Sequence, residues 1–218
     1  MRGDPGDIDP EFMEFRKAIA EAAAERAGVL GELEREEVYR RRGPLNWNWV
    51  QRILQKLESV PGLGGDMIER FTRDVWVYLT DQDVRNEINS IVMEETPLTG
   101  KFVMLGHSLG SVVAYDVLRK VQGVEVPQFI TVGSPLGVKA IVEKLRPISH
   151  PSVAKAWYNA YDEADAVALN PLDGTYFPVS PAIENYSKIK NPTDNRHGII
   201  GYLNDKVLAG KMWEAMES

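Results

Sequence analysis

The sequence has no cysteine, only three histidines and no long apolar segment. The missing cysteines exclude disulfides, thiolate nucleophiles, iron–sulfur clusters and thiolate zinc sites. The histidines, His107, His150 and His197, are scattered, so neither HExxH nor paired-histidine metal spacing occurs. We therefore expect no metal and no cofactor. Because no run of ~18 apolar residues is present, we also expect no transmembrane segment.

Basic residues are scarce relative to acidic ones, with 25 Lys and Arg against 32 Asp and Glu and a formal net charge of −7. This charge repels phosphate backbones, so we expect no nucleic-acid partner. The start of the chain does not resemble a signal peptide, because Glu21 and Glu25 interrupt the alanine-rich stretch after Lys17. We therefore expect a cytoplasmic protein.

The pattern of residues divides the chain into three parts. Residues 1–12 are rich in Asp and Pro without apolar periodicity, which is typical of an expression-vector scar; a natural acidic tail is the alternative. Residues 13–95 carry apolar side chains at helical spacing and are predicted to be mainly helical, as a lid or an edge cover. The aromatic residues of this part that we expect over a pocket are Trp47, Trp49, Phe71 and Trp76.

Residues 96–218 alternate between two kinds of pattern. Short apolar runs at 101–105, 126–132, 153–161 and 183–189 predict strands, and helical spacing at 112–121 and 199–216 predicts helices. Alternation of strands and helices is typical of an α/β domain with a parallel sheet. The predicted fold class is therefore α/β, with the sheet confined to the second half of the chain.

A G-x-S-x-G motif, Gly106-His107-Ser108-Leu109-Gly110, lies between the first predicted strand and the following helix. A serine on such a sharp turn needs glycine two residues to each side, because a Cβ there would strike the neighbouring backbone. The turn exposes the Ser108 hydroxyl at the carboxyl end of the sheet and aims the Leu109 N–H at a developing oxyanion. The alternative interpretation is an incidental tight turn.

A serine nucleophile needs a base, and the base needs an acid that fixes its tautomer. In α/β folds with this motif the chain order is serine, acid, histidine. His197 follows the last predicted strand and satisfies this order. His107 belongs to the turn itself, and His150 precedes the strand that should carry the acid. We therefore predict His197 as the base.

Three acidic residues follow the predicted strand at 153–161 and are candidates for the acid. Asp165 is our first choice, Asp162 the second and Glu163 the third, because the loop geometry could present more than one of them. A solvated acidic loop is the alternative interpretation.

Four segments in chain order, GHSLGS, TVGSPLG, YNAYDEADAVA and HGIIGYL, resemble α/β-hydrolases of the lipase and esterase type. They correspond to that family's nucleophile elbow, the end of the next strand, the acid loop and the histidine loop. The resemblance covers residues 101–203 and implies a triad of Ser108, Asp165 and His197. In many relatives a proline follows the acid; here Ala166 stands in its place, which keeps Asp162 open as the alternative.

The same family has strands before the elbow, one of which ends in a His-Gly loop that gives a second oxyanion donor. Residues 13–95 show neither feature, so we expect the usual N-terminal strands to be missing or replaced by helices, with Leu109 as the one donor we can assign. A sheet that begins at Lys101 has an open edge, and open edges associate. We expect that the preceding helices cover this edge or that two chains pair across it as a homodimer.

The expected function is hydrolysis of a small-molecule ester or lipid substrate through an acyl-enzyme on Ser108. Acyl transfer by the same triad is one alternative. A non-catalytic or truncated hydrolase-like interaction domain is the other. The sequence does not indicate the length of the acyl chain.

Overall fold

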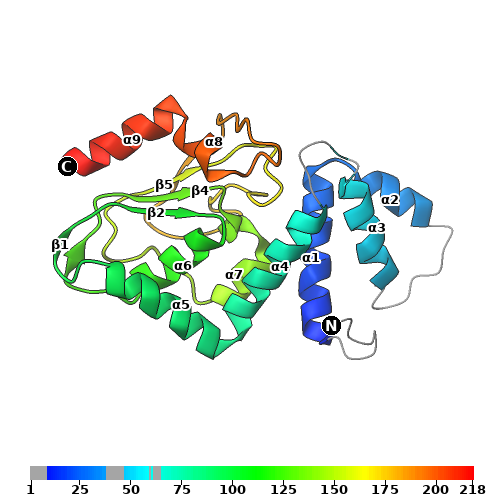
Figure 1. Cartoon of the computed structure of the whole chain (residues 1–218), viewed down its shortest axis with the longest axis horizontal. Coiled ribbons are helices and arrows are strands. Elements are labelled where there is room, and N and C mark those ends of the chain that lie inside the picture. Colours follow the sequence, from blue (N-terminus) through cyan, green and yellow to red (C-terminus); the bar gives the residue numbers. More distant parts are fainter. Residues whose placement is uncertain (1–8, 38–46, 59, 61–64) are drawn as a thin grey trace.

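The computed structural model describes residues 9–37, 47–58, 60 and 65–218, and its centre is a parallel sheet (Figure 1). Four strands lie in the order β2-β4-β5-β6, and a separate short pair joins β1 to β3. Helices lie on both faces of the sheet, so the predicted α/β class is confirmed. The strands are β1 (Gly100–Lys101), β2 (Met104–His107), β3 (Val124–Glu125), β4 (Phe129–Val132), β5 (Trp157–Ala160) and β6 (Glu184–Tyr186).

The central strands are apolar on both faces, as parallel strands covered by helices require. All four residues of β4 are buried. On one face Phe129 and Trp157, whose rings lie 4.6 Å apart, pack toward α6 (Leu109–Leu118). On the other face Ile130 and Tyr158 pack with residues of α8 (Ile199–Leu203) and α9 (Lys206–Glu217). The carboxyl ends of the strands are thereby held in a rigid layer.

The described part of residues 9–95 is helical. The helices are α1 (Pro10–Arg26), α2 (Leu30–Glu37), α3 (Trp47–Glu58), α4 (Gly65–Thr80) and α5 (Gln82–Glu95). Gly28, with φ of +73°, separates α1 from α2, and the Asp81 side chain caps α5 by accepting the N–H groups of Asp83 and Val84. Because α1 begins at Pro10 with Asp9 as its cap, part of the acidic start of the chain is ordered helix.

A buried carboxylate joins α5 to α6. Asp116 accepts two hydrogen bonds from Arg85, at 2.7 and 2.9 Å, and one each from Asn89 and Lys120. Burial acts to raise the pKa of Asp116, but these donors outweigh it and hold the pKa below its usual range. Helix α5 is thus fixed to α6, which packs on the sheet.

Strand β2 lies at the end of the four-stranded sheet and has an open outer side. The N–H groups of Phe102 and Ser108 point toward the neighbouring strands and donate to Glu125 O and Val132 O, respectively. Successive residues of a strand direct their backbone groups to opposite sides, so Val103, Leu105 and His107 direct theirs away from the sheet. Among the described residues, no backbone hydrogen bond joins this outer side to another segment. Pairing between two chains across it therefore stays a prediction.

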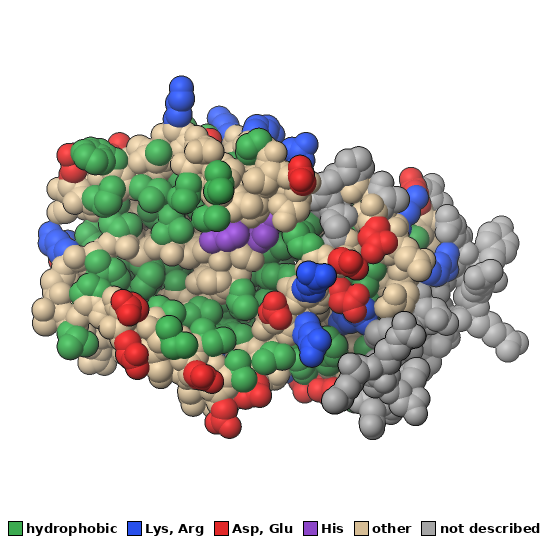
Figure 2. All heavy atoms as spheres, in the orientation of Figure 1, with side chains coloured by type: hydrophobic (Ala, Val, Ile, Leu, Met, Phe, Trp, Pro, Cys, Tyr) green, Lys and Arg blue, Asp and Glu red, His purple; other side chains and the backbone are tan. Residues whose placement is uncertain are grey.

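Hydrophobic side chains gather on both sides of this edge, over α5 and over α8 and α9 (Figure 2). Monomers seldom expose large contiguous apolar patches, so this face is the part of the surface most suited to association. The large exposed hydrophobic residues on these helices and just before β1 are Ile91, Met93, Leu98, Ile200, Leu203, Val207, Trp213 and Met216.

Several element boundaries differ from the expectations. The apolar run at 101–105 is split between β1 and β2, and the helix expected at 199–216 is two helices, because Asp205 caps α9 by accepting the N–H groups of Val207 and Leu208. The short 3-10 helix η1 (Pro135–Gly137) and helix α7 (Lys139–Leu145) were not predicted. Among the described residues no helix has both the length and the hydrophobicity needed to cross a membrane.

Candidate active site

Ser108 sits on the turn between β2 and α6 in a strained backbone conformation, with φ of 55° and ψ of −133°. Non-glycine residues at positive φ are uncommon and concentrate at functional sites. A Cβ on Gly106 would lie 2.6 Å from Ser111 Cα, so this position requires glycine. A Cβ on Gly110 would meet nothing within 4 Å, so the expected requirement for glycine there is wrong. At that position the chain has already entered α6, where the side chain points into open space.

Two buried serines hold this turn in place. Ser111 Oγ donates to the Ser108 carbonyl oxygen at 2.6 Å and lies 2.7 Å from Ser134 Oγ. Ser111 has one proton, which it gives to the Ser108 carbonyl, so Ser134 donates to Ser111. Ser134 also accepts the N–H of Leu136 at 3.3 Å. The turn is thereby tied to the end of β4 by a network that sequence reasoning missed.

The structure brings the three predicted triad residues together. His197 Nε2 lies 2.8 Å from Ser108 Oγ, and His197 Nδ1 lies 2.7 Å from Asp165 Oδ2. They come from three loops at the carboxyl ends of β2, β5 and β6, which share one edge because the strands are parallel. With Nδ1–H donating to the carboxylate, Nε2 is free to accept the serine proton. We call these three residues the Ser-His-Asp chain.

Asp165 is fully buried and accepts hydrogen bonds on both carboxylate oxygens. Oδ1 accepts the N–H groups of Val167 at 2.8 Å and Ala168 at 3.4 Å. Oδ2 accepts the hydroxyl of Tyr202 at 2.5 Å, in addition to the imidazole. Tyr202 was not singled out from the sequence, because nothing in the pattern links a helical tyrosine to the acid loop.

The two other acid candidates lie away from the histidine ring. Asp162 uses its oxygens to accept the N–H groups of Asn191 at 2.7 Å and Ala164 at 2.8 Å, so it braces the loops. Glu163 is exposed, and its carbonyl oxygen accepts from Arg26. The geometry therefore favours Asp165 over both alternatives.

Of the remaining histidines, one contacts the Ser-His-Asp chain and one does not. The His107 ring lies 4.7 Å from the His197 ring, and its Nε2 is 2.7 Å from the His197 carbonyl oxygen. Burial, followed by the nearby charge of His197, lowers the pKa of His107, so its ring is neutral at pH 7 and donates through Nε2–H. His150 instead packs edge-on against Trp157.

Gly133 at the end of β4 is another residue that sequence reasoning missed. It has φ of +56°, and a Cβ there would lie 3.0 Å from Tyr202 Cε2, 3.1 Å from Asp165 Oδ2 and 3.2 Å from His197 Cε1. Glycine at this position leaves room for the acid and the base to meet. Its place directly after a buried β-branched strand, in TVGS, is the signal that points to it.

A groove with a volume of about 500 Å³ opens over Ser108 and His197. One wall is α4, and the apolar residues that line the groove are Met67, Phe71, Leu109 and Val167, with Asp66, Arg70 and Asp74 beside them. Met67 also contacts Asn195 of the histidine loop through its sulfur, at 3.3 Å. Helix α4 therefore forms a wall of the groove and is held to the loop that carries His197.

Of the four aromatic residues expected to cover this groove, Phe71 lines it. Trp49 is buried and donates its indole N–H to Glu21 at 2.8 Å, and Trp76 packs against Phe12 and Phe15. The Trp47 side chain lies outside the described residues. The expected aromatic lid is thus wrong for Trp49 and Trp76, because both pack within the bundle of preceding helices.

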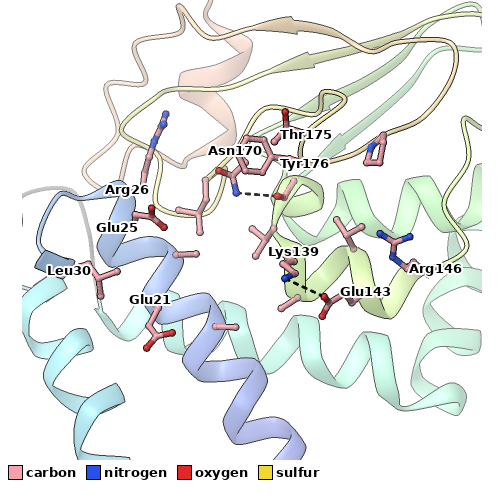
Figure 3. A pocket seen from close by; sticks show the side chains of 18 residues that line it. Glu21, Glu25, Arg26, Leu30, Lys139, Glu143, Arg146, Asn170, Thr175 and Tyr176 are labelled. Carbon is pink, nitrogen blue, oxygen red and sulfur yellow. Dashed lines mark hydrogen bonds and ion pairs between the residues drawn. The ribbon is translucent and has the colours of Figure 1, made fainter. Parts of the chain in front are cut away.

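A larger hollow, with a volume of about 1010 Å³, lies between α1, α7 and the loop at 169–178 (Figure 3). Its lining includes carboxylates from Glu21 and Glu143, and Lys139 lies 4.0 Å from Glu143. No residue of the Ser-His-Asp chain lines it. The smaller groove, and not the larger one, is therefore the candidate site.

The groove combines a hydroxyl, a base bonded to it and a buried acid bonded to the base. This arrangement can deprotonate Ser108 during attack on an electrophilic carbon, and the Leu109 N–H at the start of α6 is placed beside it. Comparison with protein-family models, with curated proteins and with solved structures found no match.

Proposed function

We propose that this protein is a serine hydrolase that cleaves carboxylic esters, with an α/β-hydrolase-like core of the lipase and esterase type. The observation that carries the proposal is the continuous hydrogen-bonded path from Ser108 Oγ through His197 to Asp165, with distances of 2.8 and 2.7 Å. A nucleophile, its base and the orienting acid at hydrogen-bond distance are the defining geometry of covalent acyl transfer. The strained backbone at Ser108 supports the same reading.

In the first half-reaction Ser108 Oγ attacks the ester carbonyl carbon while its proton passes to His197 Nε2. The Leu109 N–H donates to the resulting oxyanion, and Asp165 stabilises the imidazolium through Nδ1–H. His197 then protonates the leaving alcohol as the carbonyl–oxygen bond breaks, which leaves an acyl-enzyme. Water attacks that acyl group with His197 as base, and the carboxylic acid departs with Ser108 restored.

The groove points to an acyl group that is apolar and of moderate size. Met67, Phe71 and Val167 line it next to the nucleophile, and its volume of about 500 Å³ is within the range of small-molecule sites. The proposed substrate is therefore a small-molecule ester or a lipid, with no cofactor. Turnover is expected to be slow, because Leu109 is the one oxyanion donor we assign and one missing donor costs about 10²–10³ in kcat.

The test is a hydrolysis screen with p-nitrophenyl esters of graded acyl length, run on the wild-type protein and on Ser108→Ala. We expect wild-type turnover that depends on chain length and Ser108→Ala activity lower by on the order of 10⁶. Equal activity of the two proteins would refute the proposal. Product analysis in the presence of added alcohols separates hydrolysis from acyl transfer, and complete inactivity would favour a non-catalytic interaction domain.

A further inference from the structure

Tyr202 places its hydroxyl between the acid loop and the histidine loop. The hydroxyl oxygen lies 2.5 Å from Asp165 Oδ2 and 3.3 Å from the backbone nitrogen of Asp162. The Asp162 N–H can only donate, so the single proton of the hydroxyl must go to Asp165. The same carboxylate oxygen therefore accepts from Tyr202 and from His197 Nδ1.

The ring of Tyr202 has little freedom to move. It is completely buried and packs with Ile130 and Tyr158 on one face of the sheet. Its Cε2 lies close to Gly133: a Cβ added to that glycine would be only 3.0 Å from Tyr202 Cε2. Burial and the neighbouring carboxylates hold the pKa of Tyr202 above its usual range, so the hydroxyl stays a proton donor throughout the working pH range.

We propose that Tyr202 is a positioning residue for the reaction assigned to Ser108, an inference that rests on the proposed function. Its hydroxyl fixes the orientation of Asp165 and withdraws negative charge from the oxygen that faces His197. With less charge on Asp165 Oδ2, the carboxylate stabilises a positive charge on the ring less strongly. A tyrosine without this contact would only fill the core.

The other charged and titratable groups described beside His197 come from two elements. The ring of His107 in β2 lies tilted against the His197 ring, with centroids 4.7 Å apart, and is neutral at pH 7. Asp66, Arg70 and Asp74 of α4 line the same groove. None of them shares Asp165 Oδ2, so a change confined to the Tyr202 hydroxyl isolates its effect on the base.

The experiment replaces Tyr202 with Phe and follows the His197 ring by NMR of protein labelled with ¹⁵N-histidine. We expect the pH at which the ring protonates to rise by less than about one unit, because the Tyr202 hydroxyl bonds Asp165 in both states of the ring and only the difference between those states moves the titration. The acid limb of kcat/KM should move by the same amount. Tyr115→Phe is the matched control, because it removes a buried hydroxyl that donates to Ser149 O and should move neither quantity.

An unchanged His197 titration in folded Tyr202→Phe protein would overturn the inference, whatever happens to the rate. 3-Fluorotyrosine at position 202 keeps the ring and donates more strongly, so it should shift the titration toward lower pH and serves if the Phe variant does not fold. If the wild-type protein hydrolyses no ester but Tyr202→Phe still shifts the His197 titration, the proposed function is refuted and the effect of Tyr202 on His197 stands. Active enzyme with an unmoved titration would refute the role of Tyr202 alone.

Discussion

The contrast between Asp165 and Asp162 gives the sharpest prediction, because the two carboxylates lie in one loop and use their oxygens differently. In Asp165→Asn an amide nitrogen facing His197 Nδ1 forces the ring into the tautomer that carries its proton on Nε2. That tautomer cannot accept from Ser108, so kcat should fall by roughly 10⁴. In Asp162→Asn the base keeps its partner, so kcat should stay within about threefold.

Asp162→Asn should nevertheless lower the stability of the fold. Asp162 accepts backbone N–H groups from Ala164 and Asn191, and an amide leaves one of these donors facing another donor. An unsatisfied buried group costs about 1–3 kcal/mol, and each kcal/mol lowers Tm by about 2–4 °C in a domain of this size. Steady-state kinetics and thermal melts of both variants at equal folded concentration decide the matter. A larger kcat loss for Asp162→Asn would refute the assignment of the acid.

Three further predictions concern the surroundings of the site. Gly133→Ala should lower kcat at least tenfold, because its Cβ would lie within 3.2 Å of the acid and the base, whereas Gly110→Ala should be tolerated in the same assay. Asp116→Asn should cost about 1–3 kcal/mol in urea unfolding at pH 7, because it removes the acceptor of Arg85 and Asn89 while the exposed Lys120 can turn to water. Because the pKa of Asp116 is held below its usual range, the ionised carboxylate stabilises the fold at neutral pH, and this stabilisation is lost as the pH falls below about 4. The free energy of unfolding of Asp116→Asn should therefore fall less steeply with acid than that of the wild type. An equally steep fall would contradict this. Light scattering should show a homodimer, and Val103→Pro, which removes an outward N–H from the edge, should give monomers; a monomeric wild type would contradict pairing across β2.

The fold class and the places of Ser108 and His197 in the fold followed from local patterns. A short apolar run ending in G-x-S-x-G predicts a strand, a sharp turn and a helix, since the spacing itself encodes that geometry. His197 followed from chain order alone. The choice between Asp165 and Asp162 did not, because both lie in one short loop and only three-dimensional packing decides which carboxylate turns toward the ring.

The features that sequence reasoning missed depend on contacts between distant segments. Tyr202 reaches Asp165 across 37 positions, and Ser134 reaches Ser111 across 23. Trp49 and Trp76 carry the same apolar signal as Phe71, yet their helices turn them into the bundle. An aromatic residue at helical spacing shows that a face is buried, but it does not show what buries it.

The most direct measurement is the reaction of the folded protein with a fluorophosphonate, followed by mass spectrometry of the modified peptide. Serine attack on phosphorus displaces fluoride and leaves a stable adduct that does not depend on knowing the substrate. We expect one adduct per chain, located on Ser108, abolished by Ser108→Ala and slowed strongly by His197→Ala. His150→Ala should react at the wild-type rate. Failure of Ser108 to react, or labelling that persists in Ser108→Ala, would contradict the assignment of Ser108 as the activated nucleophile.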